Sequence, residues 1–159
     1  MSPCIFAIDP GTVQSGWAVY EDGRVLRSGV SANTDVMEMI EDAAREADID
    51  VLAIEMVASY GMGVGAEVFR TVWWTGRFAE AWLRGRGQLP MEVFRKEVCL
   101  HLCHSARAKD GNVRLALIDL LGAPGRKAEP GPTYGVASHA WQALGVAVTA
   151  ANKLQNPGA

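Results

Sequence analysis

Two short apolar runs in this sequence are each followed by a carboxylate, and this pattern restricts the possible folds more than any other feature. Residues 5–8 precede Asp9, and residues 51–54 precede Glu55. Apolar runs of this length are typical of strands that are buried on both faces of a sheet. The crevice beyond the ends of such strands is where ligands and metal ions bind in α/β proteins. The two runs therefore predict an α/β fold that brings Asp9 and Glu55 together, as in a metal-dependent enzyme.

The bulk composition fits one globular domain. The chain has 159 residues, of which 49% are apolar and 21% are charged, and this is enough to bury a core of ordinary size. No apolar run approaches the roughly 20 residues of a membrane-spanning helix, and the first residues lack the pattern of a signal peptide, so we expect a cytoplasmic protein. We expect a single domain over residues 1–150 and a disordered segment over residues 151–159.

The cysteines point to a core role rather than to disulfides or zinc. Their number, three, is odd, which argues against a disulfide framework. Cys99, His101, Cys103 and His104 lie close enough together to suggest zinc. However, Cys99 and Cys103 are expected on one helix face, where cysteine behaves as a small apolar residue, and no second pair of ligands stands elsewhere at zinc spacing. We therefore interpret this cluster as part of the core.

Apolar runs, turn signals and helical stripes together predict five strands and five helices. The expected strands cover residues 3–9, 16–20, 24–31, 51–55 and 90–94. The expected helices cover residues 35–47, 66–83, 97–104, 110–121 and 135–150. Because residues 21–23 form a hairpin turn signal, the first three strands should be antiparallel. The segments 56–65 and 122–135 are rich in glycine, so we expect them to be mobile loops. This order predicts an α/β fold with a five-stranded mixed sheet and helices on both faces.

The long helix expected over residues 66–83 has two apolar faces. One face contains Val68, Phe69, Val72, Ala79 and Leu83. The other face contains Trp74, Phe78 and Trp82. A helix with two apolar faces must bury both of them, so we expect the second face to form a homodimer interface. The alternative is that this face packs in the core of its own chain.

An ordered set of short motifs resembles a known nuclease family. The motifs are IDPGT at 8–12, SGWA at 15–18, AIE at 53–55, GRFAEA at 76–81, AKDGNV at 108–113 and SHAWQALGVA at 138–147. In this order, over residues 3–150, they resemble the RuvC family of Holliday junction resolvases, from bacteria or from bacteriophages. The resemblance implies a ribonuclease-H-like fold, metal-dependent cutting of four-way DNA junctions by paired symmetric nicks in recombination and repair, and a homodimer formed through residues 66–83.

The resemblance also implies which residues form the site. Asp9 and Glu55 match the family's two strand-end acids, and His139 and Gln142 stand where its last helix usually holds two aspartates. Residues three apart share a helical face, so both are expected to point at the site. Asp9, Glu55 and His139 are then the catalytic residues, and Gln142 joins them as a metal ligand. We expect two Mg²⁺ or Mn²⁺ ions, with the imidazole favouring Mn²⁺.

Positive side chains near the expected site are candidates for contacts with DNA phosphates. The net charge of −3 argues against a broad nucleic-acid-binding surface but allows a local basic patch. The candidates beside the site are Arg107, Lys109, Arg126 and Lys127. The candidates on the long helix are Arg70, Arg77 and Arg84, for which a solvated surface is the equal alternative. Tyr60 could stack on an unpaired base or pack on its own helix.

Three other functions stay open. The same carboxylates serve other ribonuclease-H-like nucleases, which cut RNA–DNA hybrids or branched DNA. A non-catalytic junction-binding module is a second alternative, because Gln142 carries no charge, unless an acid such as Asp110 or Glu129 substitutes. An actin-like ATP-binding protein also contains a motif such as DPGT at 9–12, but that fold needs two such domains and a second phosphate loop, and this chain is too short.

Overall fold

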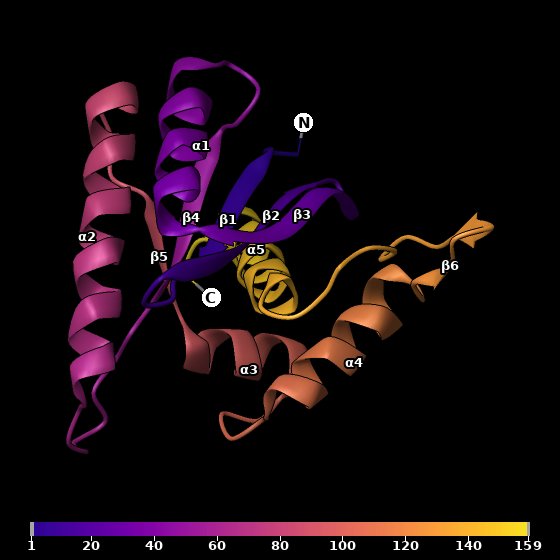
Figure 1. Cartoon of the computed structure of the whole chain (residues 1–159). Helices are drawn as coiled ribbons and strands as arrows, with labels where there is room; N and C mark the ends of the chain where they lie inside the picture. The colour runs from indigo at the N-terminus through magenta and orange to yellow at the C-terminus, as the bar shows by residue number, and fades with distance from the viewer. Residues whose placement is uncertain (1, 159) are drawn as a thin grey trace.

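The expected five-stranded sheet is present in the computed structural model, which describes residues 2–158 (Figure 1). The described strands are β1 (Ile5–Asp9), β2 (Gln14–Glu21), β3 (Arg24–Ala32), β4 (Val51–Met56), β5 (Met91–Phe94), β6 (Gly125–Arg126) and β7 (Glu129–Pro130). The described helices are α1 (Asn33–Arg45), α2 (Ala66–Arg86), α3 (Arg95–Cys103), α4 (Asp110–Leu121) and α5 (Ala140–Gln155). The α/β class and the order of the main elements are therefore confirmed.

The strand order β3-β2-β1-β4-β5 places β1 at the centre of the sheet. β1, β2 and β3 form the antiparallel meander that the hairpin turn predicts. β4 pairs with β1 in parallel, with Ile8 opposite Ile54, and β5 pairs with β4 in parallel. Because β1 and β4 run in the same direction and in register, the next residues along them, Asp9 and Glu55, reach the same edge of the sheet side by side.

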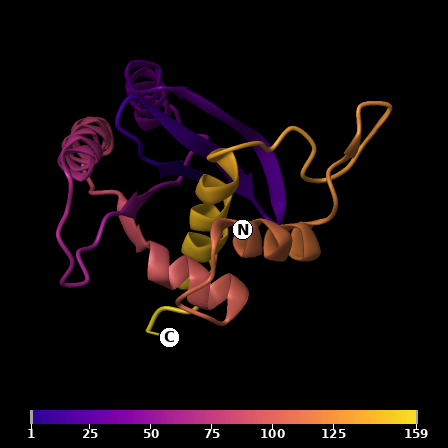
Figure 2. The same cartoon turned by 60° about the horizontal axis from the view of Figure 1, so that its bottom comes forward.

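Helices cover both faces of the sheet, as the apolar strands require. Alternate side chains of a strand point to opposite faces: Phe6 and Ile8 pack with α1 and α2, whereas Ile5 and Ala7 pack with α3, α4 and α5. α5 lies directly on β1 and β2, and its residues 140–150 are all buried. Figure 2 shows α1 and α2 on the side of the sheet away from α5. No helix in the described part of the chain is long and apolar enough to cross a membrane.

α5 begins and ends later than the sequence predicts. It begins at Ala140 rather than near residue 135, because Ser138 has a φ of 51° that a helix cannot contain. It continues to Gln155, and near its end Lys153 donates a hydrogen bond from Nζ to Oε1 of Glu97 at 2.7 Å. The prediction of a disordered segment is therefore wrong for residues 151–155, while residue 159 lies outside the described residues.

The segment 122–135 contains a hairpin rather than only a mobile loop. β6 and β7 pair in antiparallel fashion, and the hairpin projects from the end of α4 away from the sheet (Figure 1). The fully buried hydroxyl of Thr133 donates a hydrogen bond to the carbonyl oxygen of Gly122 at 2.7 Å. This bond joins the base of the hairpin to the residue that follows α4.

α2 packs on the sheet through its tryptophan face, which corrects the predicted dimer surface. Phe78 and Trp82 are 0% and 1% exposed in the core that α2 forms with α1 and the sheet. On the other apolar face, Phe69 and Val72 are 66% and 49% exposed, and the neighbouring Trp73 is 50% exposed. The alternative of core packing is therefore right for the tryptophan face. The apolar surface that is left for a partner belongs to the first half of the other face.

Candidate active site

Asp9 and Glu55 form the centre of the candidate site. β1 and β4 bring them to the same sheet edge, and their carboxyl groups lie close enough for each to affect the pKa of the other. Burial disfavours the charged form of a carboxyl group and raises the pKa of both residues. Repulsion from Asp9 adds to the burial of Glu55, and together they raise the pKa of Glu55 to about 8. Without a cation, the pair therefore holds one proton at neutral pH, on Glu55.

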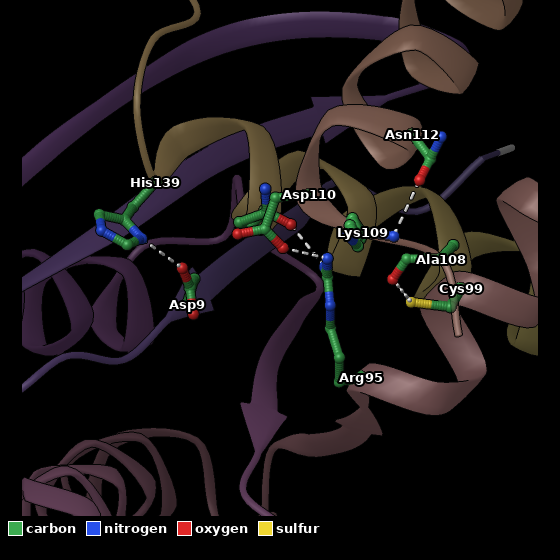
Figure 3. Close-up of polar contacts among 9 residues, drawn as sticks. Asp9, Arg95, Cys99, Ala108, Lys109, Asp110, Asn112 and His139 are labelled. Carbon is green, nitrogen blue, oxygen red and sulfur yellow. Dashed lines mark hydrogen bonds and ion pairs between the residues drawn. The ribbon is translucent and has the colours of Figure 1, made fainter. Parts of the chain in front are cut away.

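His139 lies against Asp9 (Figure 3). Its Nδ1 is 3.2 Å from Oδ2 of Asp9. The His139 side chain is 62% exposed, whereas that of Asp9 is 18% exposed, so the imidazole is open to a substrate while the carboxylate lies beneath it. The hydrogen bond and the charge of His139 lower the pKa of Asp9, against the effect of burial.

Gly16 explains how His139 comes so close to the sheet. It lies opposite Asp9 in the β1–β2 ladder, and His139 is the N-cap of α5. A Cβ atom at position 16 would lie 2.3 Å from the carbonyl oxygen of His139. Only glycine allows a second backbone to approach a strand this closely. The glycine of the SGWA motif therefore sets the start of α5 beside Asp9.

A buried hydrogen-bond network holds the loop that follows Asp9. Ser15, which is 1% exposed, donates to Oδ1 of Asn33 at 2.5 Å and accepts from the backbone N–H of Gly11 at 3.2 Å. Asn33 donates in turn from Nδ2 to the carbonyl oxygen of Gly11 at 3.0 Å. The network ties the DPGT loop to the first residue of α1. Asp9 is therefore held by β1 before it and by this loop after it. The sequence analysis did not identify Asn33, because no short motif marks it.

Arg95 is the main residue of the site that the sequence analysis missed. It is the first residue of α3, directly after β5, and it donates from Nη1 to Oε1 of Gln142 at 2.5 Å. Its Nη2 forms an ion pair with Oδ1 of Asp110 (Figure 3). Its charge also lowers the pKa of Asp9. Since β5 runs parallel to β4, the strand-end rule that identified the two acids would also have marked Arg95.

These residues line a cavity of about 510 Å³ at the edge of the sheet. Its polar and charged lining side chains include those of Asp9, Glu55, Arg95, His139 and Gln142. The carboxyl pair fits a divalent cation, because carboxylate oxygens are the preferred ligands of Mg²⁺ and Mn²⁺ and the shared proton marks a place for positive charge. Among residues 2–158, no three His, Cys, Asp or Glu side chains are grouped as a complete metal site, so water or substrate oxygens would have to complete the coordination.

Neither of the acids considered as substitutes joins the carboxyl pair. Asp110 lines the cavity, but its carboxylate is paired with Arg95. Glu129 lies in β7, on the projecting hairpin. The cysteine cluster also follows its core interpretation, since Cys99 is 1% exposed and its thiol donates to the carbonyl oxygen of Ala108 at 3.5 Å (Figure 3).

Of the predicted DNA-contacting residues, Tyr60 lies at the rim of the site, and Lys109 and Arg107 precede the cavity-lining Asp110 in the sequence. Tyr60 lines a second cavity of about 250 Å³ together with Asp9 and Glu55, and it is 65% exposed. Lys109 is exposed immediately before Asp110, and Arg107 is exposed two residues earlier.

The other predicted contact residues lie elsewhere. Arg126 and Lys127 belong to the hairpin that projects away from the sheet, so the expectation that they lie beside the site is wrong. The guanidinium carbons of Arg70 and Arg77 lie 5.2 and 4.8 Å from the ring centre of Trp73, and Arg84 lines a groove between α1 and α2. The arginine stripe therefore surrounds the exposed apolar face of α2 rather than the carboxyl pair.

Comparison with known proteins identifies the fold. No protein-family model and no curated protein sequence matches the chain. The solved structure of Thermus thermophilus RuvC is similar, with 20% sequence identity and a TM-score of 0.69 over 96% of this chain and 95% of that one. The structure of T. thermophilus RuvC in complex with a Holliday junction substrate is similar too, with 19% identity and a TM-score of 0.69 over 92% of each chain. The chain therefore has the ribonuclease-H-like fold that its motifs imply.

Proposed function

We propose that this protein is a RuvC-like endonuclease that resolves Holliday junctions in DNA recombination and repair, in the cytoplasm of a bacterium or of an infected host cell. The observation that carries the proposal is the partly buried Asp9–Glu55 pair, open to a cavity of about 510 Å³. It lies on the fold of T. thermophilus RuvC, which has been solved with a Holliday junction substrate. Neighbouring carboxylates of this kind are suited to metal-assisted phosphodiester hydrolysis.

The chemistry follows from the positions of the three titratable residues. Asp9 and Glu55 would hold Mg²⁺ or Mn²⁺, which supplies a Lewis acid and an activated water. Asp9 fixes the imidazole of His139 through Nδ1, which leaves Nε2 to move a proton. In the reaction the oxygen of water bonds to phosphorus, the bond from phosphorus to the 3′-oxygen breaks, and that oxygen takes up a proton. The products are a 5′-phosphate and a 3′-hydroxyl.

The rim of the site supplies a path for the DNA strand. On one side of the carboxyl pair, exposed Tyr60 is placed to stack on a base, as aromatic side chains do in single-strand binding. On the other side, Arg114 lines a further cavity of about 460 Å³ together with His139. Arg114, which the sequence analysis missed, would join Lys109 and Arg107 in contacting phosphates.

Paired symmetric nicks require two sites, and a two-fold dimer supplies them. The open apolar face of α2, formed by Phe69, Val72 and Trp73, borders a groove of about 1020 Å³ between α1 and α2. Arg70 and Arg77 lie over the ring of Trp73, as in interfaces where arginine and aromatic residues are enriched. We propose this face, rather than the buried tryptophan face, as the homodimer surface.

Cleavage of a synthetic four-way junction tests the proposal. The junction is compared with a linear duplex and an RNA–DNA hybrid, in Mg²⁺ and in Mn²⁺, and we expect paired nicks in the junction alone, with more activity in Mn²⁺. Asp9→Asn should abolish cleavage and leave junction binding intact, whereas Asp119→Asn, at an exposed position of α4, should cleave like the wild type. Preferential cleavage of the hybrid would assign the chain to the ribonuclease-H group of nucleases instead.

One observation favours a second candidate function, a junction-binding module without activity. Gln142 stands where the RuvC resemblance expects an acid, and its carbonyl oxygen accepts a hydrogen bond from Arg95. A site that lacks this ligand could retain the fold and the DNA-binding rim without catalysis. Junction binding without cleavage in any divalent ion would select this function over the nuclease.

A further inference from the structure

Arg95 brings a permanent positive charge into the candidate site. Its side chain is only 28% exposed, and it lines both cavities that contain Asp9 and Glu55. The guanidinium is anchored twice, by Gln142 at 2.5 Å and by an ion pair with Asp110. Gln142 is itself 8% exposed, so this anchor cannot swing into solvent.

The anchor also determines what Gln142 can do. A glutamine side chain has one acceptor atom, the carbonyl oxygen Oε1, and here Oε1 accepts from Nη1 of Arg95. A divalent cation bound to the same oxygen would lie beside the guanidinium, and two positive charges at such a distance repel each other strongly in a partly buried site. Arg95 and a cation on Gln142 therefore exclude each other.

We propose that the Arg95 guanidinium takes the place of a second divalent ion, so that the site holds one ion on Asp9 and Glu55 and Arg95 contacts the scissile phosphate. The inference rests on the proposed nuclease function for the identity of the substrate. A guanidinium has five N–H donors in a planar fork. The bonds of Arg95 to Gln142 and Asp110 leave other donors free for phosphate oxygens. Asp110, whose side chain is 73% exposed, is the anchor that a phosphate can displace.

Titration of Mn²⁺ alone into the protein tests the inference without any cleavage assay. Calorimetry should give one ion per chain for the wild type and for Lys96→Ala, a control that removes one exposed positive charge from the neighbouring residue of α3. The double variant R95A/Q142D removes the guanidinium and adds a carboxylate, and it should bind two ions per chain. Electron paramagnetic resonance should then show coupling between the two Mn²⁺ ions in the double variant alone.

Two results would overturn the inference. Two Mn²⁺ ions per wild-type chain would do so, and this measurement needs no substitution that might unfold the protein. A folded double variant that still binds one ion would do so as well, because Arg95 would then not be what excludes the second ion. Neither result depends on whether the protein cuts junctions. The cleavage assay tests the proposed function, and the Mn²⁺ titration tests this inference independently.

A rescue experiment separates phosphate contact from a structural role of Arg95. Arg95→Ala should lower kcat for junction cleavage by about 10²–10³-fold, the usual loss when a donor to a developing negative charge is removed. Added guanidinium ion should restore part of kcat, while Lys96→Ala should keep wild-type kcat and show no response. If Arg95 only held Gln142 and Asp110 in place, the Arg95→Ala variant would show a lower melting temperature and no rescue.

Discussion

Replacing Glu55 with glutamine should stabilise the metal-free protein at alkaline pH. In the folded chain, burial and the charge of Asp9 raise the pKa of Glu55 from 4.5 to about 8. A group whose pKa is raised by folding contributes stability that is fully present below its unfolded pKa and is lost as the pH rises through its folded pKa. The wild type should therefore lose stability between about pH 4.5 and pH 8, whereas the glutamine variant cannot ionise at this position.

The size of the effect follows from the same pKa difference. Each pKa unit corresponds to about 1.4 kcal/mol, so the rise from 4.5 to about 8 sets an upper limit of about 5 kcal/mol. The site opens to a cavity, and relaxation with entry of water lowers this figure, so we expect about 3 kcal/mol at pH 9. In a chain of this length the difference corresponds to a melting temperature higher by about 10 °C for Glu55→Gln.

Urea unfolding in EDTA at pH 5 and pH 9 measures this difference. Glu55→Gln should match the wild type at pH 5 and exceed it at pH 9, and added Mn²⁺ should stabilise the wild type more than the variant. Glu38→Gln, at an exposed position of α1, is the matched control and should differ from the wild type by the same amount at both pH values. An equal pH dependence for the wild type and Glu55→Gln would refute the assignment of the shared proton to Glu55.

Three further substitutions test other parts of the structure. Gly16→Ala puts a Cβ 2.3 Å from the carbonyl oxygen of His139, so it should lower the free energy of unfolding by about 1–3 kcal/mol and reduce cleavage, as urea unfolding and a junction assay would show. Trp73→Ser removes an exposed side chain that is 50% accessible, so sedimentation should show a shift from dimer to monomer with unchanged circular dichroism. The double variant R107A/K109A should weaken junction binding and reduce its salt dependence by about one unit of slope for each phosphate contact that is lost, which a filter-binding series at several salt concentrations would measure.

The part of the site that could be predicted is the part set by strands. Two continuous apolar runs of strand length marked β1 and β4 as buried, and their parallel pairing brings Asp9 and Glu55 to one edge. The position of His139 could not be obtained this way, because it depends on a turn at Ser138 and on the close approach of α5 to Gly16. Only the resemblance to RuvC placed His139 near the acids.

The errors have physical reasons of their own. Both faces of α2 are apolar, and which one faces the sheet depends on how α1 and α2 pack together, which no local pattern records. The end of α5 was placed too early because the ion pair between Lys153 and Glu97 joins residues far apart in the sequence. The hairpin of residues 125–130 was missed because its strands have two residues each, too few to show alternation.

Arg95 and Gln142 together keep the charge of the site balanced when it holds one divalent ion. Asp9 and Glu55 together offer two negative charges, which one divalent ion neutralises, and Arg95 is neutralised by Asp110. A phosphodiester then enters a site with no excess charge, and it can exchange places with Asp110 on the guanidinium. An aspartate at position 142 would add one further negative charge beside a buried pair, and a second cation would be needed to offset it. The amide of Gln142 holds Arg95 in place without that charge, which is why we expect the one-ion site and the glutamine to occur together.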